Sequence, residues 1–250
     1  MQLLDDMLLP TRVVSQPQEA GRALVDELGT LVTDDPEAVL GLATGGTPVD
    51  TYSQLSARAQ QGLDLSRVRT FNLDEYEGLA ADDPASFRSF MQRHLFGPAG
   101  IDPTRTHFPV RSHEEEPWEE AASRFEAAVE AAGGIELQVL GIGGNGHVAF
   151  NEPGSARDSR TRRIQLAELT RRVNSVGFPD PERFPTHAMT MGVGTILEAR
   201  RLRILAFGAH KASIVARILR SEPTEEVPAT LLAGHPDCQL WIDEAAASEL

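Results

Sequence analysis

The sequence predicts an α/β fold in which a mainly parallel sheet carries helices on both faces. Short apolar runs alternate with amphipathic helical patterns along the whole chain, as in successive strand–helix units. Glycine-rich turns join several of the apolar runs to the helix that follows. No repeat, linker or low-complexity segment interrupts this alternation, so we expect one domain over residues 1–250.

Each expected element follows from its own pattern. Bounded apolar runs predict strands at residues 13–14, 38–43, 68–73, 135–140, 201–207 and 238–242. Apolar residues at helical spacing predict helices at residues 18–31, 48–60, 86–96, 117–132, 193–199, 212–219 and 243–249. Residues 98–109 are expected to form a loop. The helix at 86–96 has one apolar stripe that we expect to face the core, formed by Phe87, Phe90, Met91 and Leu95.

Composition excludes several classes of function. The chain has 23 basic and 37 acidic residues, and its formal net charge of −14 disfavours nucleic acid and anionic membranes as partners. Its one cysteine, Cys238, excludes an intrachain disulfide and a cysteine-built metal site, and we expect no bound metal. The N-terminus lacks a basic signal-peptide region and no apolar run reaches membrane-spanning length, so we expect a cytoplasmic protein.

A glycine-rich segment after the strand at 135–140 holds the first candidate for chemistry. Four glycines within residues 141–146 let the backbone turn sharply and approach a ligand. His147, whose side chain titrates near neutral pH, follows at once. Asn145 and Glu152 flank it as candidate orienting partners. We therefore expect a proton-transfer site at this strand end.

The same glycines allow a second hypothesis, dinucleotide binding. Gly141, Gly143 and Gly146 match the G-x-G-x-x-G pattern, but that fingerprint needs a helix to begin within the glycines. Residues 147–154 have no helical period and contain Pro153, which favours the proton-transfer hypothesis.

Two strand–helix corners predict an anion site. The first corner consists of Thr44, Gly45, Gly46 and Thr47, with Thr47 as the expected N-cap and Pro48 as the first helical residue. Helix N-termini bind anions because their backbone N–H groups are free. The second corner contains Lys211, the sole lysine among 23 basic residues, and a compact ammonium suits a phosphate. A plain strand–helix turn and an incidental surface lysine are the alternatives.

Other polar side chains leave more than one interpretation open. Asp74 and Glu75 follow a strand, where open α/β sheets place their chemistry, although a solvated loop or N-cap is the alternative. Six arginines lie within residues 157–172, and they predict surface ion pairs, a wall of the phosphate pocket or an effector site. We expect three further histidines, His94, His107 and His113, to be structural, because their spacing suggests no metal.

Several motifs together resemble the glucosamine-6-phosphate deaminase family. They are Leu-Ala-Thr-Gly-Gly-Thr-Pro at 42–48, Phe-Asn-Leu-Asp-Glu-Tyr-Glu-Gly-Leu at 71–79, Gly-Ile-Gly-Gly-Asn-Gly-His-Val-Ala-Phe-Asn-Glu-Pro at 141–153, Ser-Arg-Thr-Arg at 159–162 and Ala-Met-Thr-Met-Gly-Val-Gly-Thr-Ile-Leu at 188–197. The match runs in order from about residue 10 to the end of the chain. The sister family, 6-phosphogluconolactonase, shares the glycine–histidine core but differs after the histidine, where this chain carries Phe-Asn-Glu-Pro like the deaminases.

The resemblance implies a Rossmann-like fold of the sugar-phosphate isomerase type. It implies conversion of glucosamine 6-phosphate and water to fructose 6-phosphate and ammonium, without a metal or organic cofactor. Asp74 matches the base that takes the C2 proton and returns it at C1 through an enolamine. His147 matches the residue that handles the O5 proton in ring opening, with Asn145 and Glu152 in the positions of its partners. The residues that match substrate- and phosphate-binding elements are Thr44, Gly45, Gly46, Thr47, Gly143 and Lys211.

Two departures from the family pattern bear on the substrate and on regulation. Val176 stands where many members have a phosphate-binding arginine, and the candidate replacements are Arg171, Arg172 and Arg183. Ile164 stands where allosteric members have a lysine, which disfavours activation by an acetylated amino-sugar phosphate.

The alternatives to a deaminase are a related sugar-phosphate isomerase or 6-phosphogluconolactonase, and a non-catalytic sugar-phosphate-binding regulator. The sequence leaves open whether the substrate is a gluco or a galacto sugar. It also leaves the oligomeric state open, since members range from monomers to hexamers and a homo-oligomer is among the alternatives.

Overall fold

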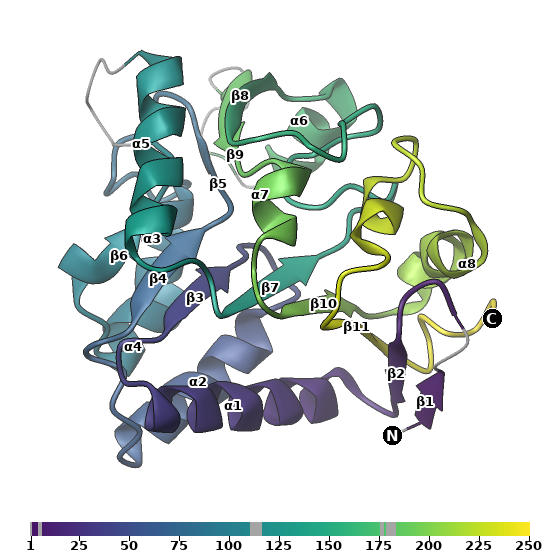
Figure 1. Cartoon of the computed structure of the whole chain (residues 1–250), viewed down its shortest axis with the longest axis horizontal. Coiled ribbons are helices and arrows are strands. Elements are labelled where there is room, and N and C mark those ends of the chain that lie inside the picture. Colours follow the sequence, from purple (N-terminus) through teal and green to yellow (C-terminus); the bar gives the residue numbers. More distant parts are fainter. Residues whose placement is uncertain (1, 5–6, 111–116, 176–177, 179–183) are drawn as a thin grey trace.

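One large sheet forms the centre of the computed structural model, which describes residues 2–4, 7–110, 117–175, 178 and 184–250 (Figure 1). Its strands are β1 (Gln2–Leu4), β2 (Thr11–Val14), β3 (Val39–Leu42), β4 (Arg69–Asn72), β6 (Thr106–His107), β7 (Leu137–Gly141), β10 (Leu202–Ala206) and β11 (Cys238–Asp243). They lie in the order β1-β2-β11-β10-β7-β3-β4-β6. Every neighbouring pair is parallel except β1 with β2, which confirms the mainly parallel sheet.

Helices cover both faces of this sheet (Figure 1). The helices on one face are α1 (Pro17–Asp34) and α2 (Val49–Gln60), and those on the other are α5 (Trp118–Ala131), α7 (Val193–Leu197) and α8 (Ala212–Arg220). Leu24 and Tyr52 pack in the core beneath the first pair, whereas Phe125, Ile196 and Val215 pack in the core beneath the second group. Both faces of the strands are therefore buried, as their continuous apolar runs predict.

A second, three-stranded sheet was not predicted from the sequence. It consists of β5 (Asp74–Tyr76), β9 (His187–Thr190) and β8 (Arg162–Gln165), in the order β5-β9-β8 and antiparallel throughout. The short helix α6 (Glu168–Asn174) follows β8. Asp74 thus lies in a strand rather than in a loop or at an N-cap. Its position is fixed by pairing with Thr190, 116 residues away in a non-local contact that local patterns do not report.

The remaining elements confirm some boundaries and correct others. The expected helix at 86–96 is α3 (Phe87–Met91) followed by a π-helical turn, η1 (Gln92–Phe96), and by α4 (Gly97–Ala99). The expected loop at 98–109 includes a short 3₁₀ helix, η2 (Pro103–Arg105), and β6. Two further 3₁₀ turns are η4 (Ala209–Lys211) and η5 (Pro228–Leu232).

The expected C-terminal helix at 243–249 is wrong. Residues 244–249 form turns, because the Asp243 carboxylate accepts hydrogen bonds from the backbone N–H groups of Gly208 and Ala246, each at 2.9 Å. An aspartate that binds nearby N–H groups stabilises a turn in competition with a helix.

The succession of strands reverses between β3 and β7. From β3 the chain proceeds outward through β4 to β6, and it then returns to β7 and proceeds outward in the opposite direction through β10 to β11. Open α/β sheets bind their ligands in the crevice outside the carboxyl ends of the strands at such a reversal. Both glycine-rich turns singled out in the sequence, after β3 and after β7, lie at this crevice.

Candidate active site

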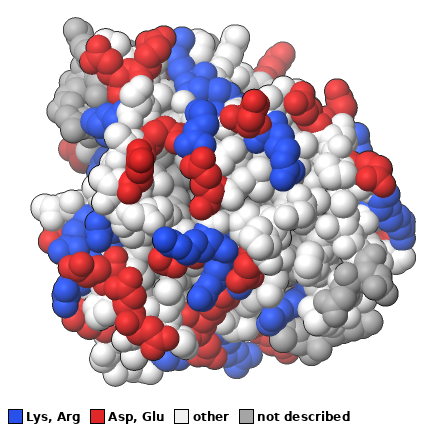
Figure 2. Space-filling view, in the orientation of Figure 1, with Lys and Arg blue, Asp and Glu red and all other residues white. Residues whose placement is uncertain are grey.

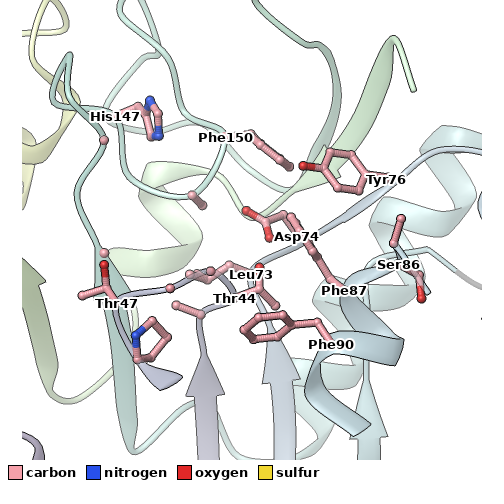
Figure 3. Close-up of a pocket in the computed structure, with 18 of the residues that line it drawn as sticks. Thr44, Thr47, Leu73, Asp74, Tyr76, Ser86, Phe87, Phe90, His147 and Phe150 are labelled. Carbon is pink, nitrogen blue, oxygen red and sulfur yellow. The ribbon is translucent and has the colours of Figure 1, made fainter. Parts of the chain in front are cut away.

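A cavity of about 750 Å³ opens where the turns after β3 and β7 meet β5 and α3. Eight residues expected to form the site line it, namely Thr44, Gly45, Gly46, Thr47, Asp74, Gly143, His147 and Lys211. Figure 3 shows Asp74 and His147 reaching the cavity from different segments, with Thr44 and Thr47 beside them. Asn145 and Glu152 do not line the cavity; they contact His147 from behind.

His147 owes its place to the glycine beneath it. A Cβ atom at Gly143 would lie 2.1 Å from Cε1 of the His147 ring, so only glycine lets the imidazole rest against the backbone. The Gly143 N–H donates to the His147 carbonyl at 2.9 Å, and the Gly146 N–H donates to the Gly143 carbonyl at 3.0 Å. Gly146 has φ 88°, in the left-handed region that glycine tolerates. The glycines therefore form a tight turn that fixes the histidine ring at the cavity wall.

The Glu152 carboxylate organises the polar groups behind His147. Its Oε2 accepts from Asn145 Nδ2 at 2.6 Å and lies 3.5 Å from His147 Nδ1. Its Oε1 accepts from the Thr170 hydroxyl at 2.6 Å. Burial would raise the pKa of Glu152, but the neighbouring His147, Thr170 and Asn145 outweigh it and lower this pKa to about 2. Glu152 is therefore an anion beside the histidine throughout the neutral pH range.

Asp74 has the opposite electrostatics. Its side chain is only 6 % exposed, and burial, together with the adjacent Glu75, raises the pKa of Asp74 to about 8. Glu75 points away and accepts the backbone N–H groups of Tyr76, Phe87 and Arg88 at 2.8, 3.0 and 2.9 Å. Glu75 thus ties the first turn of α3 to β5, a role that the sequence analysis missed. A carboxyl group with a pKa near the working pH is suited to general base catalysis.

Aromatic side chains make the environment of Asp74 apolar. The aromatic residues that line the cavity are Tyr76, Phe87, Phe90, Phe150, Phe178 and Phe184. Tyr76 is central among them, with ring centroids 4.5 Å from Phe87, 5.6 Å from Phe150 and 5.1 Å from Phe184. Phe87 and Phe90 pack against the core as expected but are only partly buried and also line the cavity, whereas Met91 and Leu95 are fully buried.

Lys211 reaches the cavity from the second corner. It precedes α8 directly, and its Nζ donates to the Ile142 carbonyl at 2.8 Å. Burial lowers the pKa of this half-buried lysine from its usual value. The other lysine or arginine lining the cavity within the described part of the chain is Arg93, which the sequence analysis did not single out. Arg93 donates to the Pro84 carbonyl at 2.9 Å at the rim.

The first corner differs from its prediction in one detail. Thr47 is not the N-cap of α2; Pro48 occupies that position, and no side chain caps the helix. Thr47 lines the cavity instead. The corner still presents the start of a helix to the cavity, which is the feature that suits an anion.

The arginines of residues 157–172 do not line the cavity, and four of them, Arg157, Arg160, Arg162 and Arg163, bind protein groups. Arg160 forms ion pairs with Glu126 and Glu198, and Arg163 pairs with Glu77 at 2.9 Å. Figure 2 likewise shows basic and acidic side chains interspersed on one face of the molecule. The surface ion-pair interpretation is therefore confirmed for Arg160 and Arg163. Two candidate replacements for the missing arginine, Arg171 and Arg172, do not line the cavity, while Arg183 and Val176 lie outside the described residues.

The dinucleotide hypothesis loses its structural basis, because no helix begins within the glycines of residues 141–146. Val148 instead forms an isolated antiparallel bridge with Asn151, and Ala149 between them has φ 51°. His107 stacks on Phe71 with ring centroids 4.5 Å apart, as expected for a structural residue. His113 lies outside the described residues.

The described residues contain neither a side-chain cluster suited to a metal ion nor a membrane-spanning helix. Among residues 2–4, 7–110, 117–175, 178 and 184–250, no three His, Cys, Asp or Glu side chains are grouped so that they could hold a metal ion. Within the same ranges, no helix combines the length and the apolar character needed to span a membrane.

Known proteins with similar sequence cover almost the whole chain. Glucosamine-6-phosphate deaminase from Rhodopirellula baltica is 42% identical over 244 residues, which is 97% of this chain and 96% of that protein. The enzyme of the same name from Hahella chejuensis is 44% identical over 239 residues, covering 95% of this chain and 90% of that protein.

Solved structures share the fold. A structure described as a monomeric glucosamine-6-phosphate deaminase superimposes with a TM-score of 0.91 at 37% identity, covering 96% of this chain and 99% of that one. A 6-phosphogluconolactonase from Shewanella baltica gives a TM-score of 0.72 at 18% identity over 93% of this chain and 97% of that one, which demonstrates a common fold only. The family model for glucosamine-6-phosphate isomerases and 6-phosphogluconolactonases matches residues 15–241. With its motifs, fold and relatives in agreement, the chain belongs to the glucosamine-6-phosphate isomerase/6-phosphogluconolactonase family.

Proposed function

We propose that this protein is a glucosamine-6-phosphate deaminase that converts glucosamine 6-phosphate and water to fructose 6-phosphate and ammonium. The observation that carries the proposal is one cavity lined by a buried carboxyl group, Asp74, an oriented imidazole, His147, and a half-buried ammonium, Lys211. Relatives named for this activity are 42% and 44% identical over nearly the whole chain. The aldose-to-ketose shift needs the first two groups, and the phosphate needs the third.

His147 acts first, by moving the proton between the ring oxygen O5 and solvent as the pyranose opens. An imidazole suits this step because it can both accept and donate a proton near neutral pH. The Glu152 anion lies 3.5 Å from Nδ1, behind the ring, and leaves the Nε2 edge available to the sugar. Asn145 supports this arrangement, since its side-chain oxygen accepts from the backbone N–H of His147 at 3.2 Å and its side-chain nitrogen donates to Glu152.

Asp74 then takes the proton from C2 of the open aldehyde while a proton of the substrate's ammonium group passes to O1, which leaves an enolamine with a C1–C2 double bond. The same carboxyl group returns the proton to C1, so that C2 becomes an iminium carbon. Water adds to C2 and ammonia leaves, which gives the ketose. The raised pKa of Asp74, about 8, makes its carboxylate a stronger base than an exposed aspartate.

Lys211 and the corner formed by Thr44, Gly45, Gly46 and Thr47 hold the phosphate in this proposal, with Gly143 leaving room beside the histidine. Fixing the phosphate sets the distance between C2 and Asp74, and such positioning is worth a large part of the rate. Arg93 supplies a second positive charge at the rim. We further propose a cytoplasmic location, in keeping with the chain's amino-sugar substrate class.

The direct test is to incubate the protein with glucosamine 6-phosphate and measure ammonium and fructose 6-phosphate in the same tube. Equal amounts of both products are expected. Asp74→Asn should lose at least roughly a hundredfold in kcat and still bind substrate, because the amide keeps the shape but is not a base. Unchanged turnover in this variant would mean that another group is the base.

The competing activity is lactone hydrolysis, since 6-phosphogluconolactonases share the fold. If glucosamine 6-phosphate gives no product, galactosamine 6-phosphate and 6-phosphogluconolactone are the next substrates to test. Binding of all three without turnover would favour a sugar-phosphate-binding regulator.

A further inference from the structure

Thr170 connects α6 to the polar groups behind His147. Its hydroxyl donates to Oε1 of Glu152 at 2.6 Å, and the residue is half-buried. The other carboxylate oxygen, Oε2, accepts from Asn145 at 2.6 Å and lies 3.5 Å from Nδ1 of His147. Glu152 is therefore held at both oxygens, by α6 on one side and by the histidine turn on the other.

The Thr170 contact limits how the carboxylate can rotate. The terminal torsion of a glutamate side chain is broad and roughly twofold, so one anchored oxygen leaves the other free to swing. The Asn145 amide holds only one of the two carboxylate oxygens, Oε2. The Thr170 hydroxyl fixes the second oxygen and hence the plane of the carboxylate. In that plane Oε2 lies 3.5 Å from Nδ1 of His147, a buried ring nitrogen that makes no hydrogen bond with the described residues.

We propose that Thr170 is a positioning residue for the ring-opening step, acting on His147 through the Glu152 carboxylate. The proposal rests on the deaminase function proposed above. Thr170 is not among the residues that line the cavity. Its loss should therefore slow a step that uses His147 and leave the binding of the sugar phosphate largely unchanged.

The experiment compares Thr170→Val, which removes the hydroxyl but keeps the shape, with Thr170→Ser, which keeps the hydroxyl. Thr170→Val should lower kcat for ammonium release roughly tenfold, the scale at which outer partners of oriented histidines act. Its KM should stay within about twofold of the wild type, and Thr170→Ser should restore most of kcat. Binding of glucitol 6-phosphate, an acyclic sugar phosphate that needs no ring opening, should be the same in all three proteins.

A double-mutant cycle tests the route through Glu152. In a Glu152→Ala background the acceptor is gone, so Thr170→Val should cause no further loss of kcat if the hydroxyl acts through this carboxylate. Losses that multiply in the double variant would overturn the proposal. So would a Thr170→Val protein with unchanged kcat, or one that loses glucitol 6-phosphate binding in parallel with kcat.

The wild-type measurement separates this proposal from the one on which it rests. A wild-type protein that releases no ammonium overturns the deaminase function and the role of Thr170 together. An active wild type with an equally active Thr170→Val variant overturns the role of Thr170 alone.

Discussion

Asp74 illustrates how the neighbours of a single side chain set its chemistry. Burial and the Glu75 carboxylate raise the pKa of Asp74 to about 8, and the side chain acts as a base only when it is ionised. For the free enzyme, kcat/KM should therefore rise with pH through about 8 and fall away on the acid side.

Glu75→Gln should move this rise in kcat/KM to lower pH by roughly one unit, because it removes the like charge next to Asp74. The glutamine retains an oxygen for the N–H groups of Tyr76 and Phe87 and loses only the acceptor of the Arg88 N–H, so two of the three backbone contacts of this side chain should remain. The measurement is the pH profile of kcat/KM, scaled to its own plateau so that the fraction of folded protein does not matter. A rise in kcat/KM that moves to higher pH, or does not move, would contradict this account of Asp74.

Gly143→Ala isolates the contact between the histidine ring and the backbone. The added methyl would lie 2.1 Å from the His147 ring, so the imidazole must rotate away while the rest of the turn keeps its hydrogen bonds. Activity should fall by roughly two orders of magnitude, as expected when a catalytic group is displaced by about an ångström. Thermal unfolding should be nearly unchanged, because the atoms that yield belong to a side chain. A retained kcat would show that His147 has no role in the rate-limiting step.

At the scale of elements, the start of α3 supports one wall of the cavity. The Ser86 hydroxyl caps this helix by accepting the Ser89 N–H at 3.0 Å, and Ser86 and Phe87 line the cavity. Ser86→Ala should reduce the free energy of unfolding by about 1 kcal/mol, as for other N-cap serines. Urea denaturation measures this change. Ser53→Ala, at an exposed position inside α2, is the matched control and should cost nothing.

The sequence predicts long, locally patterned elements well and short, non-local ones poorly. The helices α1, α2, α5 and α8 follow from apolar periodicity, and so do six strands of the large sheet, β2, β3, β4, β7, β10 and β11. The three strands of the small sheet have only three or four residues each, and non-local pairing, across more than 100 residues for β5 with β9, selects their conformation. Two residues after β4, the chain is already in β5, so no turn signal separates the two strands.

In the candidate site, too, the residues with a local sequence signal could be predicted, and those placed by non-local contacts could not. Glycines, histidine and lysine at strand–helix corners carry their own local signal, and they do meet at one cavity. Thr170 and Glu75 carry none, because a threonine in a short helix or a second acidic residue beside Asp74 is unremarkable in a linear sequence. The place of Phe87 and Phe90 at the cavity could not be predicted, because an apolar stripe at helical spacing does not say whether it faces a core or a cavity.

For the whole molecule, ligand binding offers a test of the phosphate site that does not require turnover. A ligand that binds only the folded state at about 100 times its Kd stabilises that state by about 2.7 kcal/mol. In a chain of 250 residues this should raise Tm by roughly 5–10 °C. Glucitol 6-phosphate is the probe, and glucitol without phosphate is the control.

Lys211→Met should abolish most of that rise in Tm, because Lys211 is the lysine of the cavity wall. The comparison uses the ligand-induced shift, so any loss of the contact between Lys211 and the Ile142 carbonyl cancels out. An undiminished shift in the variant would assign the phosphate to another cation, and Arg93→Met would then be the variant to examine.

The reversal of strand order between β3 and β7 also has a kinetic consequence. The cavity draws on chain segments from Ala43 to Lys211, which meet only when strands on both sides of the reversal have joined the sheet. No contiguous third of the polypeptide holds both Asp74 and Lys211. During refolding, catalytic competence should therefore recover in the slowest phase, after the helical signal has returned. A nascent chain that ends before β10 and α8 already contains Asp74, but it should have no activity.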